Sequence, residues 1–446
     1  MKKVLVSLAI ATFTAGAVLA QDASAPVLLN YNTVKKKVEK SNDDIQNPKK
    51  NVKASTWFKR GELYQEVFEL GLEQLQEGMA ATTVTLFYNQ PNSIESETLE
   101  DGTLRETYIY DHMAYTFVNG SLQEWKRLDP IHEDPLREAM DAYFKALELD
   151  EKEKLGEKIK ENLINLKTQL KREGVNDYYT GKYDEALNSF ENVLEVNSQE
   201  LFAGEMDTVM IQYSGIISRE IAGKTDDKDL YLKAIDYYKK LAEVDFGGYN
   251  TYLQIKLDYL AIGDTTAALE ILKEGYEKYP DTVNMIANVA DIYIQAKKID
   301  EGIEFMEHVI ERNPNIAESY YWNGRMLINK EEVEYIDKAI ESYKKASELD
   351  PTIYYVWYDL GYIYYLQGAD FFEREAVEEH EPTREKLNEL GKEKYEAAIP
   401  MLEKAYSLNE ENRDVKYETL DLLQRIYYKE QMMDDYNRVK ELKSNM

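Results

Sequence analysis

A repeat with a period of 34 residues constrains the fold of this chain more than any other feature of its sequence. Pro280 and Pro314 are 34 residues apart, and each closes a stretch of helical periodicity. Between them, the core-type residues recur at i, i+3, i+4 and i+7, which places them on one face of a helix. They are Ile286, Val289, Ala290 and Tyr293 in a first helix, and Gly302, Met306 and Val309 in a second. One helical pair cannot cover its own apolar face, so neighbouring pairs must stack.

One stretch of the sequence carries a signature at every position. Its pattern W-x2-L-G-x2-Y is formed by Trp357, Leu360, Gly361 and Tyr364. A near match, with Arg in place of Leu, is formed by Trp57, Arg60, Gly61 and Tyr64. On these residues the chain resembles the tetratricopeptide-repeat (TPR) family over about residues 54–75 and 133–446, as an exported bacterial member. The resemblance implies an all-α superhelical solenoid whose concave groove, lined by the first helix of each pair, holds a peptide or a partner helix.

Small residues recur where the two helices of a pair must cross. A long side chain would find no room at a close crossing, so we expect these residues to mark the points of closest approach. They are Gly61, Gly324, Gly361, Ala186, Ala234, Ala339 and Ala398.

The register divides the chain into about seven repeats and a C-terminal capping pair. The predicted parts are a signal peptide (1–20), an N-terminal helix and polar linker (21–53, with the linker at Ser41–Lys50), a first repeat (54–150) split by an insertion at about 78–130, a second repeat (151–206), repeats three to six (207–351), a seventh repeat (352–414) with a charged insertion at about 369–394, and the capping pair (415–446).

The two insertions differ in character. Thr82–Tyr88 and Thr107–Val118 have the composition of strands, and Asn119-Gly120 is a strong hairpin-turn pair before a returning strand at Ser121–Arg127. The first insertion therefore predicts a small β-hairpin, or a loop of strand character. The second insertion predicts either a pair of extended helices, the second starting near Pro382, or a solvated hairpin.

The N-terminus has the grammar of an export signal. Lys2 and Lys3 precede an apolar run from Val4 to Val18, and small residues allow cleavage after Ala20. An uncleaved anchor is the alternative, but the run is short for a membrane span. We therefore expect export to a bacterial periplasm or to the cell exterior.

Acid dominates base, with 84 Asp and Glu against 54 Lys and Arg and a formal net charge of −30. Such a charge opposes binding to nucleic acid or to anionic lipid and favours basic partners. Most of the acid is expected on the solvated faces of helices.

The sequence holds no recognisable catalytic or cofactor motif. It has no phosphate-binding glycine loop, no nucleophile elbow and no cysteine. Its four histidines do not have the i, i+4 spacing of a metal site. We therefore expect no enzyme, no cofactor and no metal.

The register places several tyrosines and one arginine on the concave face. Tyrosine and arginine are typical of protein-binding hot spots, although rings at these positions can also pack between repeats. The predicted partner-binding residues are Tyr178, Tyr179, Tyr321, Arg325, Tyr355, Tyr358, Tyr362 and Tyr365.

Three functions compete at this stage. The first is a non-enzymatic adaptor that holds a partner protein or peptide in the tyrosine-rich groove. The second is a structural subunit of an envelope or secretion assembly, or of a homo-oligomer, that contacts partners through its insertions. The third is a small-ligand receptor or enzyme with its site in the 78–130 insertion.

Overall fold

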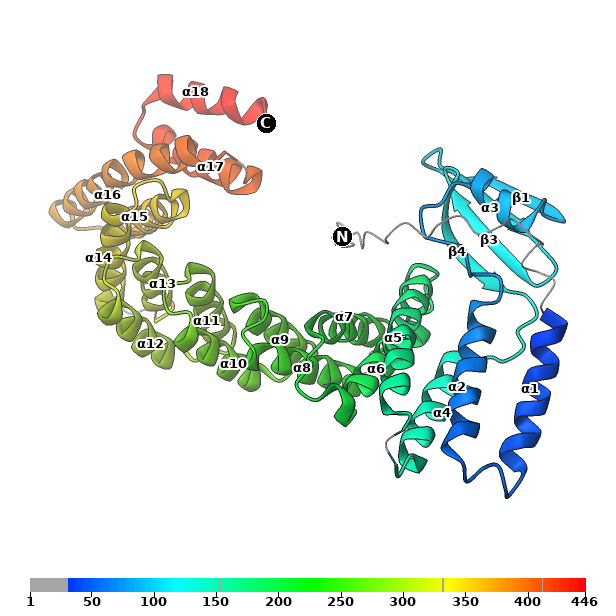
Figure 1. Cartoon of the computed structure of the whole chain (residues 1–446). Coiled ribbons are helices and arrows are strands. Elements are labelled where there is room, and N and C mark those ends of the chain that lie inside the picture. The colour runs from blue at the N-terminus through cyan, green and yellow to red at the C-terminus, as the bar shows by residue number, and fades with distance from the viewer. Residues whose placement is uncertain (1–30, 153, 331–332, 411) are drawn as a thin grey trace. The chain divides into compact units, whose positions relative to one another are not determined.

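The computed structural model describes residues 31–152, 154–330, 333–410 and 412–446. The predicted signal peptide lies outside these residues. The described chain contains eighteen α-helices and one four-stranded sheet (Figure 1). It forms two compact units, one ending at Ile217 and the other beginning at Ser218. The all-α class with a small β insertion is therefore confirmed.

The first unit combines helical pairs with the sheet. Its helices are α1 (Tyr31–Gln46), α2 (Ala54–Glu69), α3 (Ala81–Tyr88), α4 (Pro135–Leu149), α5 (Gly156–Tyr179), α6 (Tyr183–Asn197) and the first part of α7 (Thr208–Thr225), with a 3-10 turn at Glu200–Phe202. Helix α2 pairs with α4 across the whole insertion, and α5 pairs with α6. A Cβ on Gly61 would lie only 2.4 Å from Cε1 of Tyr143, which confirms the close crossing expected there.

The arginine that departs from the signature serves an added helix. Arg60 is buried, and its Nε donates to Glu138 of α4 at 2.5 Å. Its Nη1 donates to Ser41 and Asn42 of α1, both at 3.0 Å. Because α1 extends through Ser41, the polar linker expected at Ser41–Lys50 is wrong over its first half: those residues continue the helix to Gln46.

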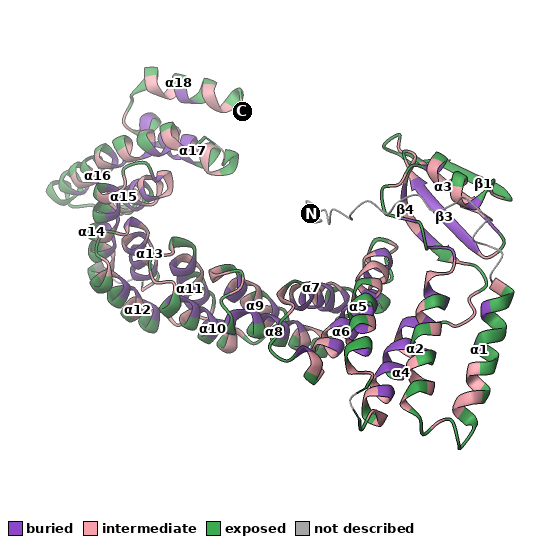
Figure 2. Ribbon diagram, in the orientation of Figure 1, coloured by how far each residue is buried: buried purple, intermediate pink, exposed green. Residues whose placement is uncertain are grey.

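The insertion folds into an antiparallel meander. Its strands are β1 (Ser93–Thr98), β2 (Leu104–Ile109), β3 (Met113–Val118) and β4 (Ser121–Arg127), and they follow one another in that order across the sheet. Asn119 and Gly120 turn between β3 and β4 with φ of 50° and 80°, as the hairpin prediction requires. Strand β3 is the most buried strand and β1 the most exposed (Figure 2).

The strand expected at 82–88 is wrong, because these residues form α3. Its β-branched run has strand propensity, but Ala81, Val84 and Tyr88 recur at helical spacing and are all buried. Tyr88 packs on Tyr115 of the sheet, with ring centroids 5.4 Å apart. Tertiary packing on one face therefore outweighs local propensity.

The second unit is a continuous series of helices. They are the end of α7, α8 (Lys228–Glu243), α9 (Tyr249–Ala261), α10 (Thr265–Lys278), α11 (Val283–Gln295), α12 (Ile299–Arg312), α13 (Ala317–Ile328), α14 (Val333–Leu349), α15 (Tyr354–Val377), α16 (Glu381–Leu408), α17 (Arg413–Lys429) and α18 (Met433–Ser444). Within this unit α9, α11 and α13 line one side of the series, and α10, α12 and α14 line the other (Figure 1).

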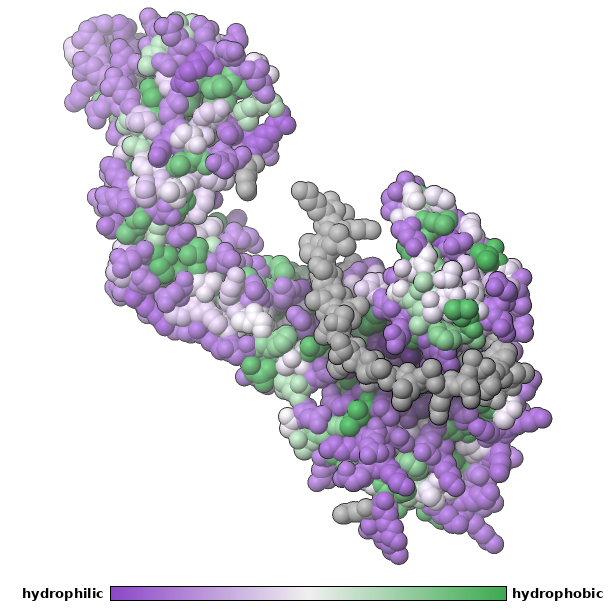
Figure 3. All heavy atoms as spheres, turned by 45° about the horizontal axis from the view of Figure 1, so that its top comes forward, coloured by the Kyte–Doolittle hydropathy of each residue, from purple (hydrophilic) through white to green (hydrophobic). Residues whose placement is uncertain are grey.

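The charged second insertion takes the first of its two expected forms. Helices α15 and α16 each run beyond the usual repeat length and pack against each other, with Pro382 in the first turn of α16. Hydrophilic residues cover most of the face shown in Figure 3. Within the part of the chain that the structure describes, no helix is long and apolar enough to cross a membrane.

Candidate functional site

An apolar pocket opens on the first helices of the second and third repeats. It lies entirely within the first unit and has a volume of about 100 Å³. For comparison, a protein cavity of about 150 Å³ admits benzene. The pocket is lined by Val175, Tyr178 and Tyr179 of α5, Phe190 of α6, and Met210, Tyr213, Ile216 and Ile217 of α7. The lining is therefore wholly aliphatic and aromatic apart from three phenol hydroxyls.

Two of the predicted partner-binding residues form one wall of this pocket. The rings of Tyr178 and Tyr179 meet edge to face at 5.8 Å, and Tyr179 is 46% exposed. Tyr213 forms the opposite wall and lies 6.1 Å from the ring of Phe190. Burial, and then the charge of Glu77, raises the pKa of Tyr179, so an acidic group lies close to the pocket.

Local sequence explains why α5 and α7 take these positions. Asp207 caps α7 by accepting from the backbone N–H of Met210 at 3.1 Å, and it also accepts from Lys171 of α5 at 2.6 Å. On the other side, a Cβ on Gly174 would lie 2.6 Å from Cε1 of Phe190, so only glycine lets α6 approach so closely. The pocket is thus held by an ion pair and a close helix crossing.

The residues of α7 were missed by the sequence analysis, although a signal existed. Tyr213 lies 34 residues after Tyr179, which is one repeat period. Met210, Ile216 and Ile217 then follow from helical spacing around Tyr213.

The remaining predicted residues lie on α13 and α15 of the second unit. Tyr321 is buried, and its ring lies 4.6 Å from that of Tyr355. Arg325 donates to the Tyr321 hydroxyl at 3.3 Å and lies 3.6 Å from the carboxylate of Asp359. Burial raises the pKa of Asp359, and the neighbouring Arg325 opposes that rise. Tyr321 and Tyr355 therefore contribute mainly to packing between repeats.

The outer part of α15 is more accessible. Tyr362 is 39% exposed and stacks on Tyr358, with centroids 6.1 Å apart and 3° between the ring planes. The Tyr358 hydroxyl donates to Glu418 of α17 at 3.1 Å. Tyr365 stacks on Tyr395 of α16 at 5.5 Å. Of the predicted tyrosines in this unit, Tyr362 is the one that offers most of its ring to solvent, and the others are fixed by neighbouring helices.

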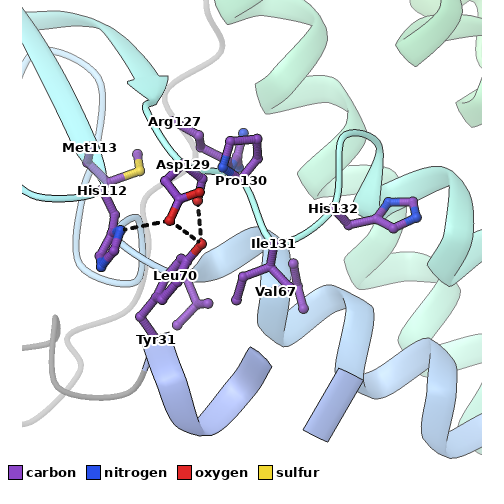
Figure 4. A pocket seen from close by; sticks show the side chains of 11 residues that line it. Tyr31, Val67, Leu70, His112, Met113, Arg127, Asp129, Pro130, Ile131 and His132 are labelled. Atoms are coloured by element: carbon purple, nitrogen blue, oxygen red, sulfur yellow. Dashed lines mark hydrogen bonds and ion pairs between the residues drawn. The ribbon is translucent and has the colours of Figure 1, made fainter. Parts of the chain in front are cut away.

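A second pocket, between α1, α2 and the sheet, has the character of a structural joint. Its volume of about 30 Å³ admits little more than one or two water molecules. Tyr31 stacks on His112 at 3.8 Å and donates to the side chain of Asp129 at 3.0 Å, as Figure 4 shows. These contacts tie the start of α1 to the sheet.

No group of three or more metal-ligating side chains occurs among the residues placed in the structure. The acidic pair Glu378 and Glu379 and its neighbour His380 lie at the junction of α15 and α16, where the His380 ring contacts the Thr383 hydroxyl at 2.8 Å.

Comparisons with known proteins match the helical repeats. Residues 259–325 match the family model described as tetratricopeptide repeat, and residues 335–368 match the one described as TPR repeat. A search of curated proteins found no match.

Solved structures give partial likenesses. A TPR-repeats protein from Bacteroides fragilis is 18% identical, over 57% of this chain and 97% of that one, with a TM-score of 0.32. A MamA protein is 19% identical over 42% and 92% of the two chains, with a TM-score of 0.29. YrrB, described as a TPR protein with an unusual peptide-binding site, is 18% identical over 48% and 94%, with a TM-score of 0.27.

Proposed function

The chain is a member of the tetratricopeptide-repeat family, and on that premise we propose that it is a non-enzymatic adaptor that binds a segment of another protein. The segment inserts one aliphatic or aromatic side chain into the pocket between α5 and α7. The observation that carries this proposal is the pocket itself: an open, apolar concavity on first helices of the repeats, where the family presents its binding surface.

The chemistry of the pocket indicates what it accepts. Removing a large apolar side chain from water contributes about 1.5–3 kcal/mol, and tyrosine walls add contact area at low entropic cost. Glu77 lies near the pocket, and the whole chain is strongly acidic. A segment with basic residues beside its apolar anchor therefore fits best.

A filled pocket tests the proposal. Peptides are selected from a random library on the full-length protein, and their affinity is measured for the wild type and for Val175→Phe. Val175 is half-buried and lines the pocket, so phenylalanine occupies the space that the anchor needs. We expect the affinity for the selected peptides to fall at least tenfold.

A matched substitution on the same helix controls for general effects. Ile164 of α5 is 47% exposed and lies outside the pocket lining, so Ile164→Phe should leave peptide affinity unchanged. If Val175→Phe binds the selected peptides as tightly as the wild type, the pocket is not the anchor site.

The tyrosines of α15 provide a second contact surface in this proposal. Tyr362 is accessible, and its partner Tyr358 is held by Glu418, so the stacked pair is rigid before binding. Rigid aromatic side chains lose little entropy on binding. Arg325 and Tyr365 flank this pair on α13 and α15.

Export is also part of the proposal. The basic start, the apolar run and the small residues before Ala20 support a signal peptide and a place of action in the periplasm or outside the cell. The mass of the protein purified from its native source tests this, because cleavage after Ala20 leaves Gln21 as the first residue. A full-length mass with Met1 retained would contradict cleavage.

A further inference from the structure

The first strand of the inserted sheet is an open edge. Strand β1 pairs with β2 on one side, and the sheet order β1-β2-β3-β4 leaves its other side without a strand among the described residues. All six residues of β1 are exposed, and the strand is green along its length in Figure 2. Proteins usually cover or blunt such an edge, because its main-chain groups can pair with another strand.

The pairing register shows which main-chain groups face outward. Leu99 donates its N–H to Thr103 at 2.9 Å, in line with the register that pairs Thr98 with Leu104. In an antiparallel pair, hydrogen-bonded positions alternate along the strand, so Glu97, Glu95 and Ser93 point their N–H and C=O groups at β2. The N–H and C=O groups of Ile94, Ser96 and Thr98 consequently point away from the sheet.

The opposite edge of the sheet is treated differently. Leu122 of β4 donates to Met79 and accepts from Gly78, both at 2.8 Å, and Trp125 donates its N–H to the Asn176 side chain at 3.2 Å. The chain therefore covers the β4 edge with its own segments and leaves the β1 edge open.

The side chains of β1 differ between the two faces. Glu95 and Glu97 share one face with Arg105, which lies 3.4 Å from Glu97 and also pairs with Glu124. Glu97 remains 59% exposed, and no cation among the described residues pairs with Glu95. On the other face Ile94 is 48% exposed beside Tyr108. One face of the edge is thus acidic, and the other is apolar at Ile94.

We propose that β1 binds an extended segment of a partner protein as a fifth strand, and that basic residues alternate with aliphatic ones in this segment. The outward main-chain groups of Ile94, Ser96 and Thr98 supply the hydrogen bonds. Basic side chains lie beside Glu95 and Glu97, and aliphatic side chains cover Ile94. Main-chain bonds then give affinity, and the alternating side chains give specificity.

Charge argues against a second copy of this chain as the occupant. Two β1 strands placed edge to edge would bring their glutamates onto the same face, and like charges across a strand pair are destabilising. The net charge of −30 on each chain adds to this repulsion. A basic segment gains from both terms.

The test uses a labelled hexapeptide of alternating lysine and valine, titrated against the full-length protein by fluorescence anisotropy. A peptide with glutamate in place of lysine is the control ligand. Ser96→Pro removes an outward N–H at an edge position, where proline is tolerated, and Ser96→Thr retains that N–H. We expect Ser96→Pro to weaken lysine-peptide binding at least tenfold, and Ser96→Thr and the wild type to bind alike.

A charge exchange keeps the test decisive if Ser96→Pro disturbs the sheet. The double variant Glu95→Lys, Glu97→Lys should lose the lysine peptide and gain the glutamate peptide. Failure of the wild type to bind the lysine peptide, or equal binding by Ser96→Pro in a folded sheet, would overturn the proposal. So would a concentration-dependent dimer that Ser96→Pro abolishes, because the occupant would then be a second copy.

Discussion

The rings of Tyr178 and Tyr179 meet edge to face, 5.8 Å apart and with 73° between their planes, although the two residues are adjacent on α5. This arrangement turns one residue toward the helical layer and leaves the other partly in solvent. Together with Tyr213, one repeat period later, they make a pocket that no single repeat could form.

Tyr179 is expected to contribute to binding without contributing to the fold. It is 46% exposed, so Tyr179→Ala should lower the affinity for library-selected peptides about tenfold and leave the melting temperature nearly unchanged. Tyr179→Phe retains the ring and should bind like the wild type. Tyr428→Ala, at a tyrosine that is 66% exposed on α17, is the control for loss of any exposed ring. Equal affinity for Tyr179→Ala and the wild type would contradict the assignment.

Asp177 should make the first unit more stable in mild acid. Burial, and then the charge of Glu173, raises the pKa of its carboxyl to about 6 against the opposing effect of Lys182. A raised folded-state pKa stabilises the fold fully below the unfolded value of about 3.9, and the effect is lost as the pH rises through about 6. The free energy of unfolding should therefore gain about 1 kcal/mol from this group between pH 7 and pH 5.

Urea titrations of the wild type and Asp177→Asn at both pH values check this. The gain on acidification should be smaller by about 1 kcal/mol in Asp177→Asn, because asparagine does not titrate. An equal gain in both proteins would show that Asp177 is not the group responsible.

The ion pair between Arg219 and Asp258 should be costly to break. Asp258 is fully buried on α9, and Arg219 donates to its Oδ2 from Nη2 at 2.8 Å. Arg219→Met leaves this carboxylate unpaired, which should destabilise the second unit by about 3–5 kcal/mol in a urea titration. The exposed pair of Arg425 and Asp421 is the control, and Arg425→Ala should cost less than about 1 kcal/mol. Similar losses in both variants would contradict the role of burial.

Gly61 should not tolerate a methyl group. A Cβ there would lie 2.4 Å from Cε1 of Tyr143, which is itself buried. Gly61→Ala should therefore destabilise the α2–α4 pair by about 1–3 kcal/mol, as measured by thermal unfolding. At Gly156, in the first turn of α5, a Cβ would meet no described atom within 4 Å, so Gly156→Ala should be neutral or stabilising. The prediction fails if the two substitutions have the same effect.

The repeat period made most of the helical fold predictable. Crossing residues such as Gly61 and Gly324 meet the large side chains of their partner helices, as their spacing predicted. Residues 82–88 were not predictable in this way, because local β-branched composition competes with a helical face that is recognised only once Tyr115 packs on it. Similarly, the hydrogen bonds of Arg60 to α1 depend on a helix outside the repeat.

The candidate site was predictable only in part. The register identified Tyr178 and Tyr179, but the pocket also needs Met210 and Ile216 from the next repeat, which the spacing could have suggested only through Tyr213. Tyr321 was placed on the binding face by its register, yet it is buried. Register gives the direction of a side chain, whereas its exposure depends on the ring beside it, here that of Tyr355.

The methyl resonance of Met210 offers the most direct test of the central claim. Met210 lines the pocket, whereas Met433 is 47% exposed on α18 and serves as an internal control. With methionine methyl groups labelled, a library-selected peptide should shift the Met210 signal and leave the Met433 signal in place. If the peptide binds and the Met210 signal does not move, the anchor lies elsewhere and the proposed site is wrong.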